Sequence, residues 1–491
     1  MRINYLLGAI SLILIYVGLV MFIPIVPALI FHEFEDVFPF LIPALCAIIM
    51  GYGLKFFNTK IANFENFNDI KKSEGLFIVV LAWVITGLIS AIPFMMMGLT
   101  PLNAIFEATS GITTTGATIL TNFDYSHAFF FWRSFTQWLG GMGIIVLFIA
   151  ILPQFAVAGR QMFFAEAPGP TEDKFTPRIR NTASALWKIY VAFTLLQTAL
   201  LFFAGMSLFD AFCNSFSTMS AGGFSPNPNS TAGYSSNAIT LIMLIFIFIA
   251  GVSFNAQYIS ITKFKPWNIF KSEEVRTYTG IFLFLGSVIG MALFFNGDYE
   301  SIKDAFLSGF YQTISLMTST GSTSADFNSW SFTPQVLLGL TLFIGGCASS
   351  AAGGIKIARW SLIFKVMKSE MQKILHPNAV MNIKLDNNIV AKDIVSQIIV
   401  FVMFYFCIIL LTGLILSILE QNLLLGYASA VSSIGNIGPA FPAEIGACGN
   451  FDSLQPLSKI IFIVNMYIGR LELVPFLVLF QRDFWIFKRN T

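Results

Sequence analysis

The chain has 491 residues, of which 56% are hydrophobic and only 11% are charged. A soluble domain usually carries about 25% charged residues, so a soluble surface is excluded and lipid must be the solvent. The net charge of +2 gives no reason to expect a nucleic-acid partner, and the five cysteines show no metal-binding spacing.

Ten stretches are apolar and long enough to cross a bilayer, since about 20 residues of helix span the hydrocarbon core. They are residues 5–30, 38–57, 75–98, 131–153, 183–205, 237–262, 278–296, 333–355, 393–418 and 457–481. Basic residues gather in alternate connecting loops, and the positive-inside rule therefore predicts that both termini are cytoplasmic.

Two leading transmembrane helices, within residues 1–72, precede four internal repeats. We expect the repeats at residues 73–182, 183–273, 274–391 and 392–491. Each contains a short, half-apolar segment, beginning at Pro101, Ser207, Ser301 and Asn422, that ends in a polar turn. Aligned on Gly116, Gly223, Gly321 and Gly438, all four have a serine six residues earlier and an aromatic residue ten or eleven residues earlier. Matches at one offset indicate parallel, homologous units.

The short segments are expected to be helices of about three turns, too short to cross the bilayer. Ser207 and Ser301 fit helix N-caps, because an acidic residue follows each at position N3, and Pro101 fits position N1. Each helix would begin near the outer surface and aim the partial negative charge of its C-terminus at the turn, which favours a cation.

The turns have the composition of a backbone ion-binding site. Rings of backbone carbonyls can replace the water around a cation, and glycine permits the unusual φ values that aim carbonyls one way. No carboxylate lies in the turns, which suits a monovalent ion better than a divalent one. Four re-entrant loops that merely pack are the alternative, but they would leave polar turns in lipid without a purpose. The expected ion ligands are Thr114, Thr115, Gly116, Ala221, Gly222, Gly223, Ser319, Thr320, Gly321, Asn436, Ile437 and Gly438.

At these turns the chain resembles the TrkH branch of the TrkH/KtrB superfamily of potassium transporters. The matching segments are TTTGAT, GGFS, TSTG and NIGP in the turns, and WLGGMGIIVL, APGP, IGGCASSAAGGIK, HPNAV and GRLE elsewhere. The resemblance implies an all-α polytopic membrane protein with four pseudo-fourfold-related helix–pore helix–filter–helix repeats around one pore, plus the two N-terminal helices. Ser322 and Ala440 depart from the residues usual in the family.

The resemblance also implies a cargo and partners. K⁺ would be the transported ion, with no bound organic cofactor. The protein would form a homodimer in a bacterial cytoplasmic (inner) membrane, gated by a cytoplasmic TrkA-type ring of nucleotide-binding subunits. No nucleic-acid partner is expected.

Two features within predicted spans suggest a gate. Four glycines in the ten residues from Gly345 to Gly354 (Gly345, Gly346, Gly353 and Gly354) would cost a helix about 1 kcal/mol each. We therefore expect an unwound gate loop under the filter, with a small-residue packing face as the alternative. Arg470 near the middle of the last span costs about 2.5–3.5 kcal/mol to insert. We expect it to face the pore and to form a barrier to cations.

Two other classes of protein compete with a pore. An enzyme is not expected, because the HExxH, GxSxG and GxxxxGK[ST] motifs do not occur. An H⁺- or Na⁺-coupled cation symporter is the alternative. Such transporters often use inverted repeats, whereas these repeats all begin from the same side.

Overall fold

Helices make up nearly all of the regular structure in this computed structural model, which describes residues 3–61, 72–151, 176–377, 381–386, 388–447 and 449–472. The exception is an antiparallel hairpin of β1 (Lys384–Leu385) and β2 (Asn388–Ile389). Among the described residues, six helices are long and apolar enough to cross a membrane, and one bent pair makes a seventh. The predicted all-α polytopic fold is confirmed.

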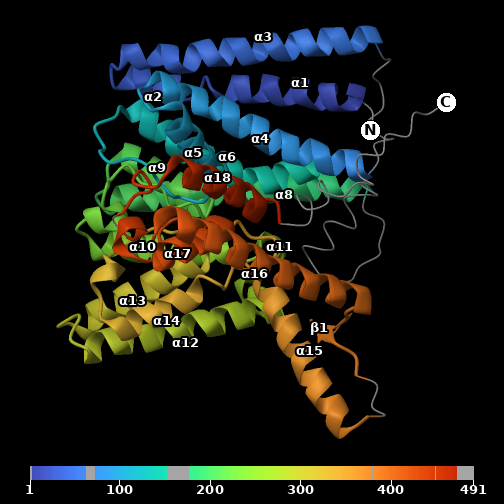
Figure 1. The fold of residues 1–491 in the computed structure, drawn as a ribbon, viewed down its shortest axis with the longest axis vertical. Helices are drawn as coiled ribbons and strands as arrows, with labels where there is room; N and C mark the ends of the chain where they lie inside the picture. Colours follow the sequence, from blue (N-terminus) through green and yellow to red (C-terminus); the bar gives the residue numbers. More distant parts are fainter. Residues whose placement is uncertain are drawn as a thin grey trace.

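The leading helices form a hairpin along one side of the molecule (Figure 1). α1 (Ile3–Val20) packs against α3 (Val37–Ile61), and the short α2 (Ile25–Ile30) lies between them in sequence. Gly18 and Gly51 lie at the contact, where a Cβ on either would come within 2.8 Å of a backbone oxygen of the other helix. Small residues at such a crossing let two helices approach closely in lipid.

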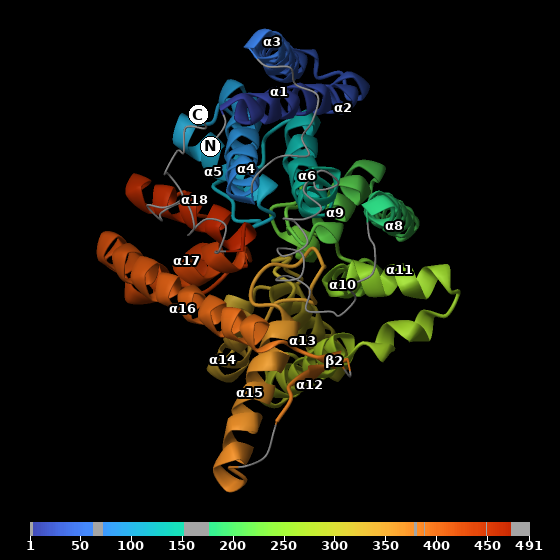
Figure 2. The same ribbon diagram turned by 90° about the vertical axis from the view of Figure 1, so that its right-hand side faces the viewer.

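The other described helices form four units, each with a long helix, a short helix and a returning segment. Their bounds are α4 (Lys72–Met96), α5 (Pro101–Ile112), α6 (His127–Ile151); α8 (Thr176–Phe203), α9 (Leu208–Met219), α10 (Asn237–Gly251), α11 (Phe254–Thr262); α12 (Glu273–Phe295), α13 (Ile302–Met317), α14 (Phe332–Thr341), α15 (Ile357–Leu375); α16 (Lys392–Glu420), α17 (Leu423–Gly435), α18 (Pro456–Arg470). Figure 2 shows these units around a common centre. Contacts of α6 with α9, α10 with α13, α15 with α16 and α18 with α5 close the circle.

The short helices α5, α9, α13 and α17 have 12, 12, 16 and 13 residues, too few to cross the hydrocarbon core. Pro101 occupies the first position of α5, and the Ser207 hydroxyl accepts the N–H of Asp210 at 3.0 Å. Ser301 is the N-cap of α13 without a side-chain bond. Asn422 caps α17 by accepting the N–H of Leu425 at 3.2 Å, a signal that the sequence prediction left out.

Two predicted spans are not continuous helices. The span at 237–262 divides into α10 and α11, which meet at an angle of 99°. The Gln257 amide donates to the carbonyls of Ile249 at 2.7 Å and Val252 at 3.1 Å, and so satisfies groups that the break exposes. In the span at 333–355, helix α14 ends at Thr341 and is followed by a loop. α15 then extends away from the bundle (Figure 1).

The last predicted span, 457–481, is helical only as far as Arg470 within the part of the chain that is described. Residues 473–481 lie outside the described residues. Arg470 is the last residue of α18, so the described part of this span does not continue as a helix past it. The apolar run continues past this point in the sequence, so hydropathy alone does not mark the end.

Candidate functional site

The four aligned glycines meet in a closed ring. A Cβ added to any of them would lie closer than 3.0 Å to a backbone carbonyl oxygen of the neighbouring repeat. The contacts join Gly116 to the oxygen of Gly222, Gly223 to that of Thr320, Gly321 to that of Ile437, and Gly438 to that of Thr115. Each oxygen belongs to the residue just before the next glycine, and the fourth contact returns to the first repeat. The predicted ion ligands are thus brought together, and no side chain fits at the four glycines.

The backbone of each turn alternates in handedness. φ is 78°, 76°, 70° and 84° at the four glycines, and 52°, 55°, 56° and 52° two residues earlier, at Thr114, Ala221, Ser319 and Asn436. The residue between them does not have positive φ. In such alternation successive carbonyls can point to one side, whereas in a strand they alternate. A left-handed residue other than glycine costs about 1–2 kcal/mol, so its recurrence in four turns indicates that the surroundings enforce the conformation.

Hydrogen bonds at the end of each short helix enforce the turn. The N–H of the residue before each glycine donates to the carbonyl of the aligned serine. The pairs are Thr115 to Ser110 (2.9 Å), Gly222 to Ser217 (2.8 Å), Thr320 to Ser315 (2.8 Å) and Ile437 to Ser432 (3.0 Å). The N–H of the left-handed residue donates three residues back, as from Thr114 to Gly111 at 2.9 Å. These two bonds form the Schellman motif that ends many helices. They occupy the N–H groups of the left-handed residue and of the residue before each glycine, and leave the carbonyls of these residues to other partners.

The ring offers a cation backbone oxygens rather than carboxylates. Among the described residues, no group of three or more His, Cys, Asp or Glu side chains is placed to hold a metal ion. Each of the four short helices ends at a turn of the ring, where the C-terminal end of a helix carries partial negative charge. Such a site can replace the hydration shell of a monovalent cation without fixing it permanently.

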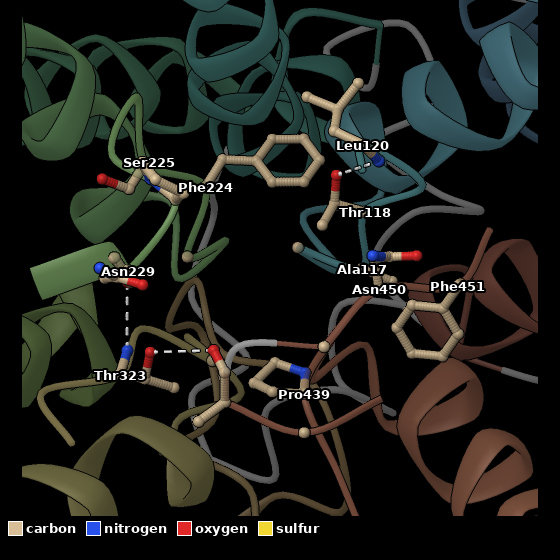
Figure 3. A pocket seen from close by; sticks show the side chains of 18 of the residues that line it. Ala117, Thr118, Leu120, Phe224, Ser225, Asn229, Thr323, Pro439, Asn450 and Phe451 are labelled. Carbon is tan, nitrogen blue, oxygen red and sulfur yellow. Dashed lines mark hydrogen bonds between the residues drawn. The ribbon is translucent and has the colours of Figure 1, made fainter. Parts of the chain in front are cut away.

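A cavity of about 180 Å³ opens onto the ring (Figure 3). Side chains from all four repeats surround it, including Thr118, Phe224, Thr323 and Pro439. Within the described part of the chain, no Asp or Glu lines this cavity, and Arg133 is the charged residue in its wall. The cavity lies directly against three of the four ring glycines, Gly116, Gly223 and Gly321.

Arg133 belongs to a buried ion pair behind the first turn. Its Nε lies 2.5 Å from a carboxylate oxygen of Glu107, and the two side chains are 3% and 0% exposed. The carboxylate also accepts the Thr118 hydroxyl at 3.0 Å, while the guanidinium donates to the Ser225 carbonyl at 3.0 Å. The guanidinium also lies 3.6 Å from the centroid of the Phe224 ring. The pair therefore links the first two turns, and loss of either member would leave a buried charge uncompensated.

Residues 342–356, between α14 and α15, form a non-helical loop that contacts the ring. Two backbone bonds close its base, from Gly345 N–H to Ile355 O at 2.8 Å and from Ile357 N–H to Gly346 O at 3.1 Å. At the inner end, the N–H of Gly353 donates to the Ser319 hydroxyl at 2.5 Å. The loop is therefore hydrogen-bonded directly to the turn of the third repeat.

The rest of this loop is held by the second and third repeats. Its Cys347 N–H donates to Gly251 O at 2.9 Å, at the break between α10 and α11. The Glu274 carboxylate on α12 accepts the N–H of Ala348 at 2.6 Å and that of Ala358 at 3.2 Å. One carboxylate thus fastens both the loop and the first turn of α15.

Arg470 contacts the same loop from the fourth repeat. Its guanidinium donates to the carbonyls of Ala351 at 3.0 Å and Gly140 at 3.3 Å, and the residue is 5% exposed. Nearby Glu472 pairs with Arg359 on α15 at 2.5 Å. The predicted gating residues, four loop glycines and Arg470, are therefore parts of one contiguous structure beside the ring.

Two buried polar residues of this region were missed by sequence reasoning. Gln137 on α6 contacts the turn of the second repeat, and Glu274 contacts the loop. Each lies within or at the edge of an apolar helix. A polar residue in such a helix is the signal that could have found both.

These features define a polytopic membrane protein of the transport class, in which four repeats bring backbone carbonyls into one ring. The chain belongs to the TrkH family, described as cation transport protein, which matches residues 40–485. The predicted membership of the TrkH branch is confirmed, and the family is one of transport proteins rather than enzymes.

Several relatives match most of the chain. It is 38% identical over 422 residues to the Trk system potassium uptake protein TrkH of Escherichia coli (strain K12), covering 85% of this chain and 87% of that protein. It is 33% identical over 492 residues to the Trk system potassium uptake protein TrkH of Vibrio parahaemolyticus, and the match covers 99% of this chain and 100% of that protein. The crystal structure of the potassium transporter TrkH from Vibrio parahaemolyticus matches with a TM-score of 0.89 at 30% identity, covering 99% of this chain and 100% of that one.

Proposed function

We propose that this protein mediates potassium uptake through a channel-like pore whose selectivity filter is formed by the four turns. The closed ring of glycine–carbonyl contacts is the observation that carries the proposal. The relatives described as potassium uptake proteins support K⁺ as the transported ion. The carbonyls of the predicted ligand residues would replace water around the ion, as in other carbonyl filters.

Gating is assigned in this proposal to the loop at 342–356 together with Arg470. The loop is bonded to the ring through Ser319 and to Arg470 through Ala351, which supports a role in blocking the exit from the filter. A positive charge at this place raises the energy of a cation nearby. Displacement of the loop would remove both the obstruction and the contact that holds the arginine.

The test is ion flux in liposomes that contain the purified protein, with K⁺, Rb⁺, Na⁺ and Li⁺ compared. We expect K⁺ and Rb⁺ to move down the membrane potential at rates about tenfold or more above Na⁺ and Li⁺, a difference of ~1.4 kcal/mol. Equal rates for all four ions would refute the filter. Slow, saturating K⁺ flux that requires an H⁺ or Na⁺ gradient would instead establish the coupled symporter.

The proposal extends to location and assembly. The protein would lie in a bacterial inner membrane with both termini cytoplasmic, as two leading helices (1–72) and repeats at 73–182, 183–273, 274–391 and 392–491. It would form a homodimer under a cytoplasmic TrkA-type ring. In support, Phe364, Met367 and Met371 on the extended α15 are 62%, 55% and 67% exposed. Their helical spacing makes one apolar face, of the kind that marks an interface.

The assembly can be tested separately from transport. Light scattering on the purified protein should give the mass of two chains plus detergent, and added ring subunits should change K⁺ flux in liposomes. A monodisperse single chain would contradict the homodimer without affecting the filter.

A further inference from the structure

The side chain of Gln137 spans the second filter turn. Its Nε2 donates to the Gly222 carbonyl at 2.5 Å, and its Oε1 accepts the N–H of Phe224 at 3.1 Å. The residue is fully buried on α6, a helix of the first repeat. One amide group therefore holds the backbone on both sides of Gly223, from across the boundary between two repeats.

The carbonyl that Gln137 holds is part of the ring. Gly222 O is the oxygen that approaches Gly116, in the position that Thr115, Thr320 and Ile437 occupy in the other turns. Over the described residues, no side-chain donor is hydrogen-bonded to those three equivalent carbonyls. The second turn alone shares its ring oxygen with a protein amide in this part of the chain.

The other turns are held at different atoms. In the third repeat, the Ser315 hydroxyl donates to the Ser322 carbonyl at 2.5 Å. In the fourth, the Asn436 amide donates to the Thr115 hydroxyl at 2.9 Å, which joins the last turn to the first. The second turn differs in sequence as well, because Ala221 and Gly222 precede its glycine and neither supplies a polar side chain. Gln137 provides from outside the hydrogen bonds that the turn itself lacks.

We infer that Gln137 is a positioning residue that sets the selectivity of the filter. An Ala-Gly-Gly backbone has few restraints of its own, and glycine adds conformational freedom. The paired hydrogen bonds keep the Gly222 carbonyl at a fixed distance from the axis. A ring that cannot contract holds a larger monovalent ion better than a smaller one. Without the amide, the second turn can adjust to a smaller cation, so discrimination falls while conduction persists.

The inference rests on the proposed filter, and the experiment separates the two. Gln137→Met and Gln137→Leu remove both hydrogen bonds, because each puts an apolar side chain in place of the amide. Gln197→Leu is the matched control, because Gln197 is also fully buried but donates to the Met243 sulfur at 3.3 Å rather than to a carbonyl of the ring. Each protein is reconstituted in liposomes, and Na⁺ and K⁺ fluxes are measured under the same membrane potential.

We expect the K⁺ to Na⁺ flux ratio to fall about five- to tenfold in the Gln137 variants, the scale of one buried hydrogen bond, with K⁺ flux within about threefold of the unmodified protein. The Gln197 variant should keep the original ratio. An unchanged ratio in a folded Gln137 variant would overturn the inference. So would failure of both variants to fold, since Gln137 would then be a folding residue. A lack of K⁺ preference in the unmodified protein would instead refute the proposed function.

Discussion

Replacing Gly223 with alanine places a methyl group against the Thr320 carbonyl oxygen of the neighbouring turn. The obstacle is backbone, so it cannot rotate away as a flexible side chain would. Overpacking of this kind costs about 1–3 kcal/mol. If the strain is relieved by opening the ring that an ion must cross, K⁺ flux should fall by about 5-fold to about 150-fold, at about 1.36 kcal/mol per factor of ten.

The chain offers a close control for this substitution. Gly297, between α12 and α13, has φ of 79° against 76° at Gly223, but a Cβ there would have no neighbour within 4 Å. Gly297→Ala therefore carries the same left-handed strain without the collision, and flux should change by no more than about twofold. Rubidium tracer uptake into liposomes, at equal amounts of monodisperse protein, measures both. Equal loss of flux in the two variants would attribute the effect to backbone strain and refute the ring as its cause.

Three further substitutions test the gate loop and the ion pair. Arg470→Ala should raise K⁺ flux in liposomes, because it removes the positive charge beside the loop. Unchanged flux in a folded variant would contradict a role of Arg470 as a barrier to cations. Glu274→Gln replaces a charge-assisted hydrogen bond by a neutral one, a loss of about 1 kcal/mol. The loop should then open more often, with flux up about fivefold, and reduced flux would show that the carboxylate favours the open state. Glu107→Gln leaves the Arg133 charge buried without its counterion. Thermal unfolding in detergent should reveal a loss of about 3–5 kcal/mol, and an unchanged melting temperature would contradict a stabilising role of the pair.

The ring of turns was predictable from the sequence because it requires glycine at one aligned position in each of the four repeats. Only glycine has both the φ and the space that the contact demands, so the four glycines align. The serine six residues earlier aligns for a weaker reason. Its backbone carbonyl accepts an N–H of the turn, which any residue could do, while the hydroxyl of Ser315 donates to the Ser322 carbonyl just after its turn and that of Ser432 donates to the carbonyl of the ring glycine Gly438.

Other features left no comparable pattern. The left-handed residues of the four turns are Thr, Ala, Ser and Asn, of which only Asn favours that conformation by itself. The break after Gly251 lies inside a stretch that is apolar enough as a whole to span a membrane, and the carbonyls that it exposes are satisfied by Gln257 of the same stretch and by the distant loop. Contacts of Gln137 and Glu274 join residues more than 70 positions apart, and such pairing is decided by packing in three dimensions.

All four turns of the ring belong to a single polypeptide. Dilution cannot dismantle such a ring, since its closure is intramolecular and independent of protein concentration. The four turns can also diverge in sequence, because a mutation in one turn leaves the other three unchanged. In a ring made from four copies of one subunit, every mutation changes all four turns. A contact made at one turn alone, such as that of Gln137 with Gly222 and Phe224, is possible only where the turns differ in sequence.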